Sequence, residues 1–286
     1  MADFDAQPVN AGTSKGFSFT SQLRVAAPFT ETNMTWVEVE NSTAADWAGF
    51  YILVTQGIGL SGVAGVFFVA KGAAASEVRV ASVPAIMGVK ANAHMQYVPI
   101  PIPSGTRLSV SCTTETAAVH HGQIIGVLSA NFDAEPAFTV YDTGPYDLSN
   151  TTTYGHWVAV DAGATADTKG SYTEVSYTSH TNNVLNGDSL ASTYDYFGLT
   201  MNGNFNLSQT TAYFLSDFAT GAAASEVIYG GDLSLETTAQ EKISYNTPLE
   251  VRTAVATSGT RISARCQSSI TNSVDRIIGA LLWGAR

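Results

Sequence analysis

Hydrophobic and polar residues alternate along much of the chain, a pattern typical of half-buried β-strands. The segments 36–40, 107–112 and 261–266 place apolar side chains on one face and polar ones on the other. The runs 123–128 and 276–282 are almost wholly apolar, which predicts strands at the centre of a sheet. Helical periodicity is weak, and turn residues separate the segments. We therefore predict an all-β protein built from β-sandwich, jelly-roll-like domains.

The chain also repeats itself. The heptapeptide at 72–78 recurs unchanged at 221–227, and Ser-Gly-Thr-Arg at 104–107 recurs at 258–261. The offsets are 149 and 154 residues, and Cys112 matches Cys266 at the latter offset. Matches that keep their order at nearly constant spacing indicate a tandem duplication. The Trp-containing segments 36–40 and 157–161 match at an offset of only 121, which predicts an insertion of 28 residues near 178–207 of the second copy.

These matches divide the chain into an N-terminal arm, two repeats and a linker. We predict an arm at 1–16, a first sandwich at 17–137 and a second sandwich at 146–286. The segment 138–145 is predicted to be a linker, because Asp-Thr-Gly-Pro strongly favours a break in regular structure.

Composition and charge argue against several classes of partner. The net charge is −11, charged residues make up only 13% of the chain, and no basic run is present. Nucleic-acid binding is therefore not expected. The sequence contains neither a secretory signal nor the ~20 consecutive apolar residues of a membrane span. We expect synthesis in the cytoplasm of a host cell and no membrane insertion.

The repeated polar residues are candidates for either chemistry or support. Glu77 and Glu226 lie in the repeated heptapeptide, and Arg107 and Arg261 lie in the repeated turn. They are compatible with a catalytic pair, but no nucleophile accompanies them, so we favour ion pairs or backbone hydrogen bonds that fix the turn. Cys112 and Cys266 fall on apolar strand faces and are predicted to be buried thiols without a reactive role.

No cofactor or metal is expected. The segment 57–62 matches Gly-x-Gly-x-x-Gly, but a strand-like run follows it where a dinucleotide site needs a helix. The five histidines lack the spacing of a metal site, and the neighbours His120 and His121 would point to opposite faces of a strand. The acidic loops 161–167 and 182–188 leave calcium binding open as an alternative.

Three aromatic residues in the predicted insertion are the strongest binding candidates. Tyr194, Tyr196 and Phe197 lie close together, and aromatic side chains on a loop can stack on a sugar or anchor an interface. The alternative is that they fold back onto the sheet.

The repeated heptapeptide and the Pro-Ile-Pro-Ser-Gly-Thr-Arg-Leu-Ser-Val-Ser-Cys turn and strand at 101–112 resemble modules of tailed-bacteriophage virion proteins. That class comprises capsid decoration, fibre and tail-associated subunits, and the resemblance covers about 60 residues of each half. It implies a non-enzymatic structural subunit that resides in the virion. Its partners would be further copies of itself, for instance in a trimer, other virion proteins, and a host-surface glycan. A carbohydrate-binding lectin-like module and a β-sandwich hydrolase remain as alternatives.

If binding depends on the predicted insertion, removing it should spare the scaffold. Deletion of residues 180–206 is expected to leave a folded protein, measured by circular dichroism and thermal unfolding. Loss of folding would place the segment in the core.

Overall fold

The computed structural model describes residues 14–20, 22–23, 35–56, 63–87, 94–114, 119–128, 138–144, 158–176, 185–186, 189–202, 211–238, 249–251, 257–273 and 275–286. Every regular element in these ranges is a β-strand, so the predicted all-β class is confirmed. None of these residues belongs to a helix that is long and apolar enough to cross a membrane.

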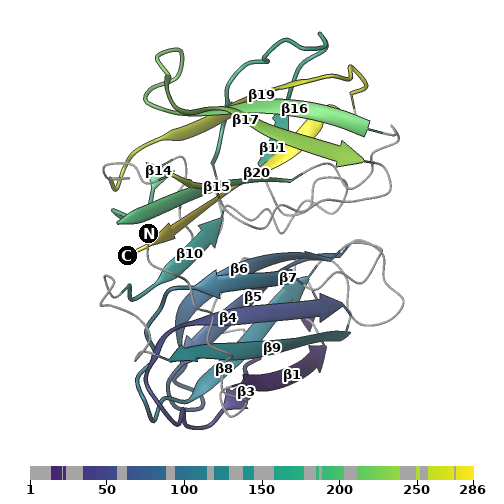
Figure 1. Ribbon diagram of the computed structural model, residues 1–286. Coiled ribbons are helices and arrows are strands. Elements are labelled where there is room, and N and C mark those ends of the chain that lie inside the picture. The colour runs from purple at the N-terminus through teal and green to yellow at the C-terminus, as the bar shows by residue number, and fades with distance from the viewer. Residues whose placement is uncertain are drawn as a thin grey trace.

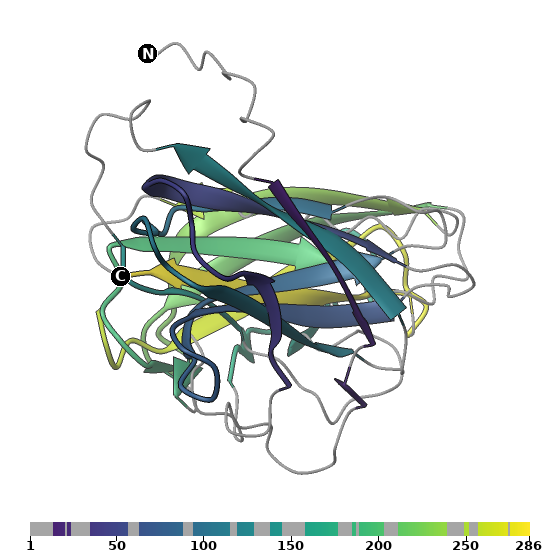
Figure 2. The same ribbon diagram turned by 90° about the horizontal axis from the view of Figure 1, so that it is seen from below.

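The first repeat folds into a sandwich of two sheets, seen in the lower half of Figure 1. One sheet has the strand order β1-β9-β4-β7, and the facing sheet contains β6-β5-β8, with β2 and β3 both paired to β8. The strands are β1 (Ser14–Thr20), β2 (Gln22–Leu23), β3 (Val37–Glu40), β4 (Trp47–Gln56), β5 (Val63–Lys71), β6 (Val78–Met87), β7 (His94–Val98), β8 (Leu108–Thr114) and β9 (Val119–Leu128). Figure 2 shows β1 alongside β9 at one edge.

The second repeat uses the same strand order. Its sheets are β20-β15-β18, with β10 and β11 on the free edge of β20, and β12-β19-β16-β17. The strands are β10 (Tyr141–Gly144), β11 (Val158–Asp161), β12 (Thr173–Glu174), β13 (Leu185–Asn186), β14 (Ser189–Leu190), β15 (Tyr196–Asn202), β16 (Thr211–Thr220), β17 (Val227–Thr238), β18 (Leu249–Val251), β19 (Ile262–Ser268) and β20 (Ile277–Ala285). In the first copy β9 lies between β1 and β4, and in the second β20 lies between β11 and β15.

This order corrects the predicted insertion. β3 pairs with β8, whereas β11 pairs with β20, the counterpart of β9, so the matching segments 36–40 and 157–161 do not occupy corresponding places in the two sandwiches. By pairing, β11 is the counterpart of β1, which begins 144 residues earlier, and this offset is close to the 149 of the heptapeptide. The offset of 121 was misleading because a short Trp-Val alternation suits any half-buried strand. The described part of the segment 178–207 holds the short pair β13 and β14 and then β15, a central strand, so it is not simply a loop.

The predicted linker also contains a strand. Tyr141–Gly144 forms β10, which pairs antiparallel with β20 and meets β6 through a parallel bridge between Tyr141 and Ala81. Gly144 is the last residue of this strand, and Pro145 lies outside the described residues. β10 thereby joins half of each sandwich into one ten-stranded sheet (Figure 1).

Strand β20 serves both hydrophobic cores. Ile278, Ala280 and Leu282 belong to the core of the second sandwich, whereas Trp283 and Ala285 belong to that of the first. Because neighbouring side chains on a strand point to opposite faces, a single strand can supply both cores. Its eight residues from Ile278 to Ala285 are all buried.

Aromatic side chains on this framework lie across glycines. A Cβ atom on Gly198 would overlap the indole of Trp283, and one on Gly126 would overlap Trp47. At both glycines an aromatic ring therefore packs directly on the backbone, where a side chain would not fit. Trp283 also stacks on Tyr141, with ring centroids 5.4 Å apart.

The architecture reverses the expectation for the deletion of residues 180–206. The deleted segment contains all of β15, whose neighbours are β18 and β20, together with the buried Tyr194 and Phe197. We now expect the shortened chain not to fold.

Truncating Trp283 should destabilise both sandwiches together. Trp283→Ala is expected to lower the free energy of unfolding by about 3–5 kcal/mol, because it leaves a cavity in the core of the first sandwich. The effect should reach both sandwiches, because β20 also supplies side chains to the core of the second. Urea unfolding followed by circular dichroism and by fluorescence should give one coincident transition. The exposed Tyr213→Ala is the control and should change stability by less than about 0.5 kcal/mol. Two separate transitions, only one of them moved by Trp283→Ala, would contradict the shared core.

Candidate functional site

The repeated arginine of the first copy ties an exposed hairpin to the sandwich. Arg107 Nη1 donates to the carbonyl oxygen of Gly72 at 3.0 Å and to Glu77 Oε1 at 3.1 Å. Its Nε donates to Glu38 Oε2 at 2.7 Å. The guanidinium therefore crosses from β8 to the turn between β5 and β6.

The second copy repeats this arrangement with longer contacts. Arg261 Nη1 lies 3.0 Å from the carbonyl oxygen of Gly221 and 3.5 Å from Glu226 Oε1. Glu174 takes the place of Glu38, 3.5 Å from Arg261 Nε. The structure thus brings together both predicted Glu–Arg pairs, each bound to the backbone of a turn.

The two cysteines are core residues. Cys112 and Cys266 are buried, and the Cys266 thiol donates weakly to the carbonyl oxygen of Val160 at 3.6 Å. Burial raises the pKa of Cys112 well above its ordinary value, and burial together with the nearby Asp161 raises the pKa of Cys266 to about 12. Both thiols therefore stay protonated and poorly reactive at neutral pH.

The predicted aromatic binding residues do not form an exposed surface. Tyr194 is 1% exposed and Phe197 3% exposed, both within the core of the second sandwich. The Tyr194 ring lies over Gly284 of β20. The side chain of Tyr196 lies outside the described residues. The binding hypothesis is therefore wrong for Tyr194 and Phe197, because they point inward from a central part of the sandwich.

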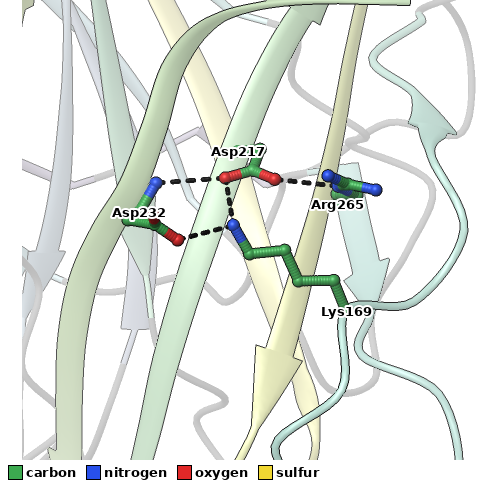
Figure 3. A network of polar contacts seen from close by, with 4 residues as sticks. All are labelled: Lys169, Asp217, Asp232 and Arg265. Atoms are coloured by element: carbon green, nitrogen blue, oxygen red, sulfur yellow. Dashed lines mark hydrogen bonds and ion pairs between the residues drawn. The ribbon is translucent and has the colours of Figure 1, made fainter.

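A network of charged side chains lies on the outer face of the sheet β12-β19-β16-β17 (Figure 3). At its centre is Asp217 of β16, whose side chain is fully buried. Lys169 Nζ donates to Asp217 Oδ1 at 2.5 Å and to Asp232 Oδ1 at 2.6 Å, and Arg265 Nε donates to Asp217 Oδ2 at 2.8 Å. The backbone N–H of Asp232 completes the shell around Asp217 at 3.0 Å.

This network has no counterpart in the first repeat. Phe67 pairs with Cys112 just as Ser216 pairs with Cys266, so the next positions align Asp217 with Phe68 and Arg265 with Ser111. An aromatic residue and a small hydroxyl thus stand where the second copy has an ion pair. The Arg265 guanidinium also lies over the Tyr172 ring, 4.6 Å from its centroid.

The loop 162–172 is held firmly against the same sheet. Arg276 donates to both carboxylate oxygens of Asp161, at 2.7 and 3.0 Å, and the N–H of Gly163 donates to one of them. Farther along, the N–H groups of Asp167 and Gly170 donate to backbone carbonyls of β19. These hydrogen bonds, together with the contact from Lys169 to Asp217, fix the loop on the sheet.

A shallow hollow of about 520 Å³ opens beside this loop. Its lining combines strand residues with one loop residue: Asp167, Tyr213, Phe214, Leu215, Ser234, Leu235 and Gln267. Tyr213 is 57% exposed, so a large aromatic side chain on this face is open to solvent. The sequence analysis did not single out any of these residues.

The carboxylates of Asp217 and Asp161 are both held in their ionised form. Burial alone would raise the pKa of Asp217, but hydrogen bonds from Lys169, the Asp232 N–H and Arg265 outweigh it and leave the pKa below its ordinary value. The hydrogen bonds from Arg276 lower the pKa of Asp161, against the smaller opposing effect of burial.

The structure shows no metal-binding site in the ranges that it describes. No three His, Cys, Asp or Glu side chains are grouped there so that they could hold an ion. The side chains of the five histidines, the glycine-rich segment 57–62 and most of the loop 182–188 lie outside those ranges. In the other proposed calcium loop, Asp161 is occupied by Arg276.

Comparisons with known proteins do not assign the chain to a family. No family model and no curated protein matches it. Among solved structures it is similar to a chain in the cryo-EM structure of broad bean stain virus, with 12% identity over 93% of this chain and 91% of that chain, at a TM-score of 0.30.

Two further likenesses are of the same order. A tandem pair of CBM22 domains from Paenibacillus barcinonensis Xyn10C shares 12% identity over 96% of this chain and 91% of that one, at a TM-score of 0.26. PNGase F, a glycosylasparaginase from Flavobacterium meningosepticum, shares 8% identity over 94% of this chain and 96% of that one, at a TM-score of 0.25. Similarity at this level supports no functional conclusion.

The ion-paired carboxylates of Asp217 and Asp161 should make the stability of the fold decrease at low pH. A carboxylate whose folded pKa is depressed contributes stability that is fully present above its unfolded pKa, near 3.8, and lost as the pH falls through the lower folded value. The urea midpoint should therefore fall as the pH drops below about 4. Asp217→Asn and Asp161→Asn should each flatten this fall while lowering stability at pH 7. Parallel pH curves for variant and wild type would contradict the assignment.

Proposed function

We propose that this chain is a non-enzymatic structural subunit of a virus particle, and that it assembles through its two repeated hairpin tips. The tips are residues 73–78 and 222–227. The observation that carries this proposal is that they are identical in two otherwise diverged copies, although most of their side chains point into solvent.

Internal support explains only part of this identity. In each copy the arginine, Arg107 or Arg261, binds the carbonyl of the glycine and the carboxylate of the glutamate in the repeated heptapeptide, so these two residues are needed for the fold. The three alanines and the serine between them are exposed in both copies, and so are Val78 at 61% and Val227 at 65%. Since the core does not need these side chains, their identity favours an external contact that both copies make.

The backbone of the tips points the same way. Ala75 has φ 64° and Ala224 has φ 62°, in the left-handed region that favours glycine. Non-glycine residues held in this region often mark functional turns. Retention of alanine at both positions is consistent with a methyl group that contacts a partner.

Charge makes these tips suitable for contact between copies. Each chain carries a net charge of −11, so copies repel one another over most orientations. The tips expose only small uncharged side chains, and their glutamates are paired to arginines. Contact at the tips would bring the least negative charge together.

The architecture suits such a role. Jelly-roll sandwiches occur in viral capsid and lectin domains, an analogy at the level of fold. A shared sheet keeps two tips on one body, so a subunit could contact two neighbours at once. The proposal extends to a virion of a tailed bacteriophage, with other virion proteins as partners and assembly in the host cytoplasm.

Charge introduced at the tips should block assembly without unfolding the chain. The double variant Ala74→Asp, Ala223→Asp should weaken self-association at least about tenfold, because like charges then meet at each contact. Analytical ultracentrifugation and electron microscopy of the full chain measure this. Ala164→Asp, an equally exposed alanine on the loop 162–172, is the matched control and should assemble normally.

Two results would overturn the proposal. One is wild-type association that the double variant leaves unchanged, and the other is a wild-type chain that stays monomeric and is absent, by mass spectrometry, from particles purified from its source.

A further inference from the structure

The hollow on the outer face of the second sandwich has the composition of a saccharide site. One side is the exposed ring of Tyr213, and the polar groups around it are Asp167, Ser234 and Gln267. A pyranose presents a C–H face that packs against an aromatic ring, and hydroxyls that need mixed donors and acceptors. A carboxylate, a hydroxyl and an amide together supply both.

Tyr213 is positioned by main-chain contacts that leave its ring available. Its N–H donates to Ser269 Oγ at 3.0 Å, and its carbonyl accepts the N–H of Ser269 at 2.9 Å. Aromatic rings with an apolar body and a polar tip are well suited to sites that are half wet. A rigid backbone beneath the ring reduces the ordering needed on binding.

The loop residue in the lining, Asp167, is equally well fixed. Asp167 has φ 54°, and its N–H donates to the carbonyl oxygen of Ser268 at 2.8 Å. Two residues later, Lys169 fastens the loop to Asp217. The exposed Asp167 carboxylate thereby stands at the rim of the hollow, and no side chain in the described part of the structure binds it.

The charge of the hollow selects among saccharides. Lys169 is neutralised by Asp217 and Asp232, and Arg265 by Asp217, so neither cation next to the hollow is free to attract an acid. Asp167 adds a negative charge at the rim. An acidic sugar would be repelled, whereas a neutral one could donate hydroxyl hydrogens to Asp167.

The first repeat provides an internal comparison. The strand pairing that aligns Cys112 with Cys266 places Ala64 at the position of Tyr213 and Thr113 at that of Gln267. The ring and the amide are therefore missing from the first copy, and the site is particular to the second.

The geometry points to a binding site for a neutral saccharide on the outer face of the second sandwich, with Tyr213 as the stacking platform and Asp167, Ser234 and Gln267 as hydrogen-bonding groups. This inference does not depend on assembly through the tips, which lie at the turns between β5 and β6 and between β16 and β17.

Glycan binding by the full-length chain tests the inference. An array of immobilised neutral and sialylated oligosaccharides is the probe, followed by titration calorimetry with the best-bound free oligosaccharide. The wild type should bind a class of neutral glycan. Tyr213→Ala should weaken that binding roughly tenfold or more, Gln267→Ala should also weaken it, and Tyr213→Trp should retain it. Met95→Ala, which removes a side chain 58% exposed on the first sandwich, is the control and should leave binding unchanged.

The outcomes separate the site from the fold and from assembly. Thermal unfolding should show that Tyr213→Ala is as stable as the wild type, and the double tip variant should still bind glycan. The inference is overturned if no glycan binds, if sialylated glycans are preferred, or if both Tyr213→Ala and Gln267→Ala bind as well as the wild type.

Discussion

The structure depends on one strand that is buried on both faces. β20 directs Ile278, Ala280 and Leu282 into one core and Trp283 and Ala285 into the other. A strand in this position cannot exchange an apolar residue for a polar one on either face without a partner for the polar group. It also explains why β10 pairs with β20 and carries Tyr141 onto Trp283: the junction between the repeats is itself part of the core.

With the interior constrained in this way, the two copies differ mainly on outer faces. In the second copy, Asp217 replaces an aromatic residue, and its buried charge requires Lys169, Arg265 and a backbone N–H around it. Lys169 comes from a loop, so neutralising Asp217 also fixes that loop on the sheet. One substitution in a strand is thus linked to the wall of a hollow that the first copy does not have.

Alternation and repetition were enough to predict the fold class, the strands at 36–40, 107–112, 123–128, 261–266 and 276–282, and the buried cysteines. They failed where a pattern is shared by many strands: the similarity of 36–40 to 157–161 matches two strands that do not correspond in the two sandwiches. Tyr194 and Phe197 were misplaced because they were assigned to an inserted loop, whereas they belong to, or directly precede, the central strand β15. The network beside the hollow left one signal in the sequence, Asp217, which is the one charged residue of strand β16. Tyr213 left none, since an exposed and a buried tyrosine look alike in a strand.

The position of Trp283 has a consequence for synthesis. A chain is made from its N-terminus, and domains usually fold in that order as they emerge. Here the core of the first sandwich includes two side chains of β20, which is the last strand of the second repeat. The core of the first sandwich therefore cannot be completed until the ribosome has made nearly all of the second repeat. A chain cut short by premature termination would expose the apolar site meant for Trp283, which would mark it for degradation before it could join an assembly.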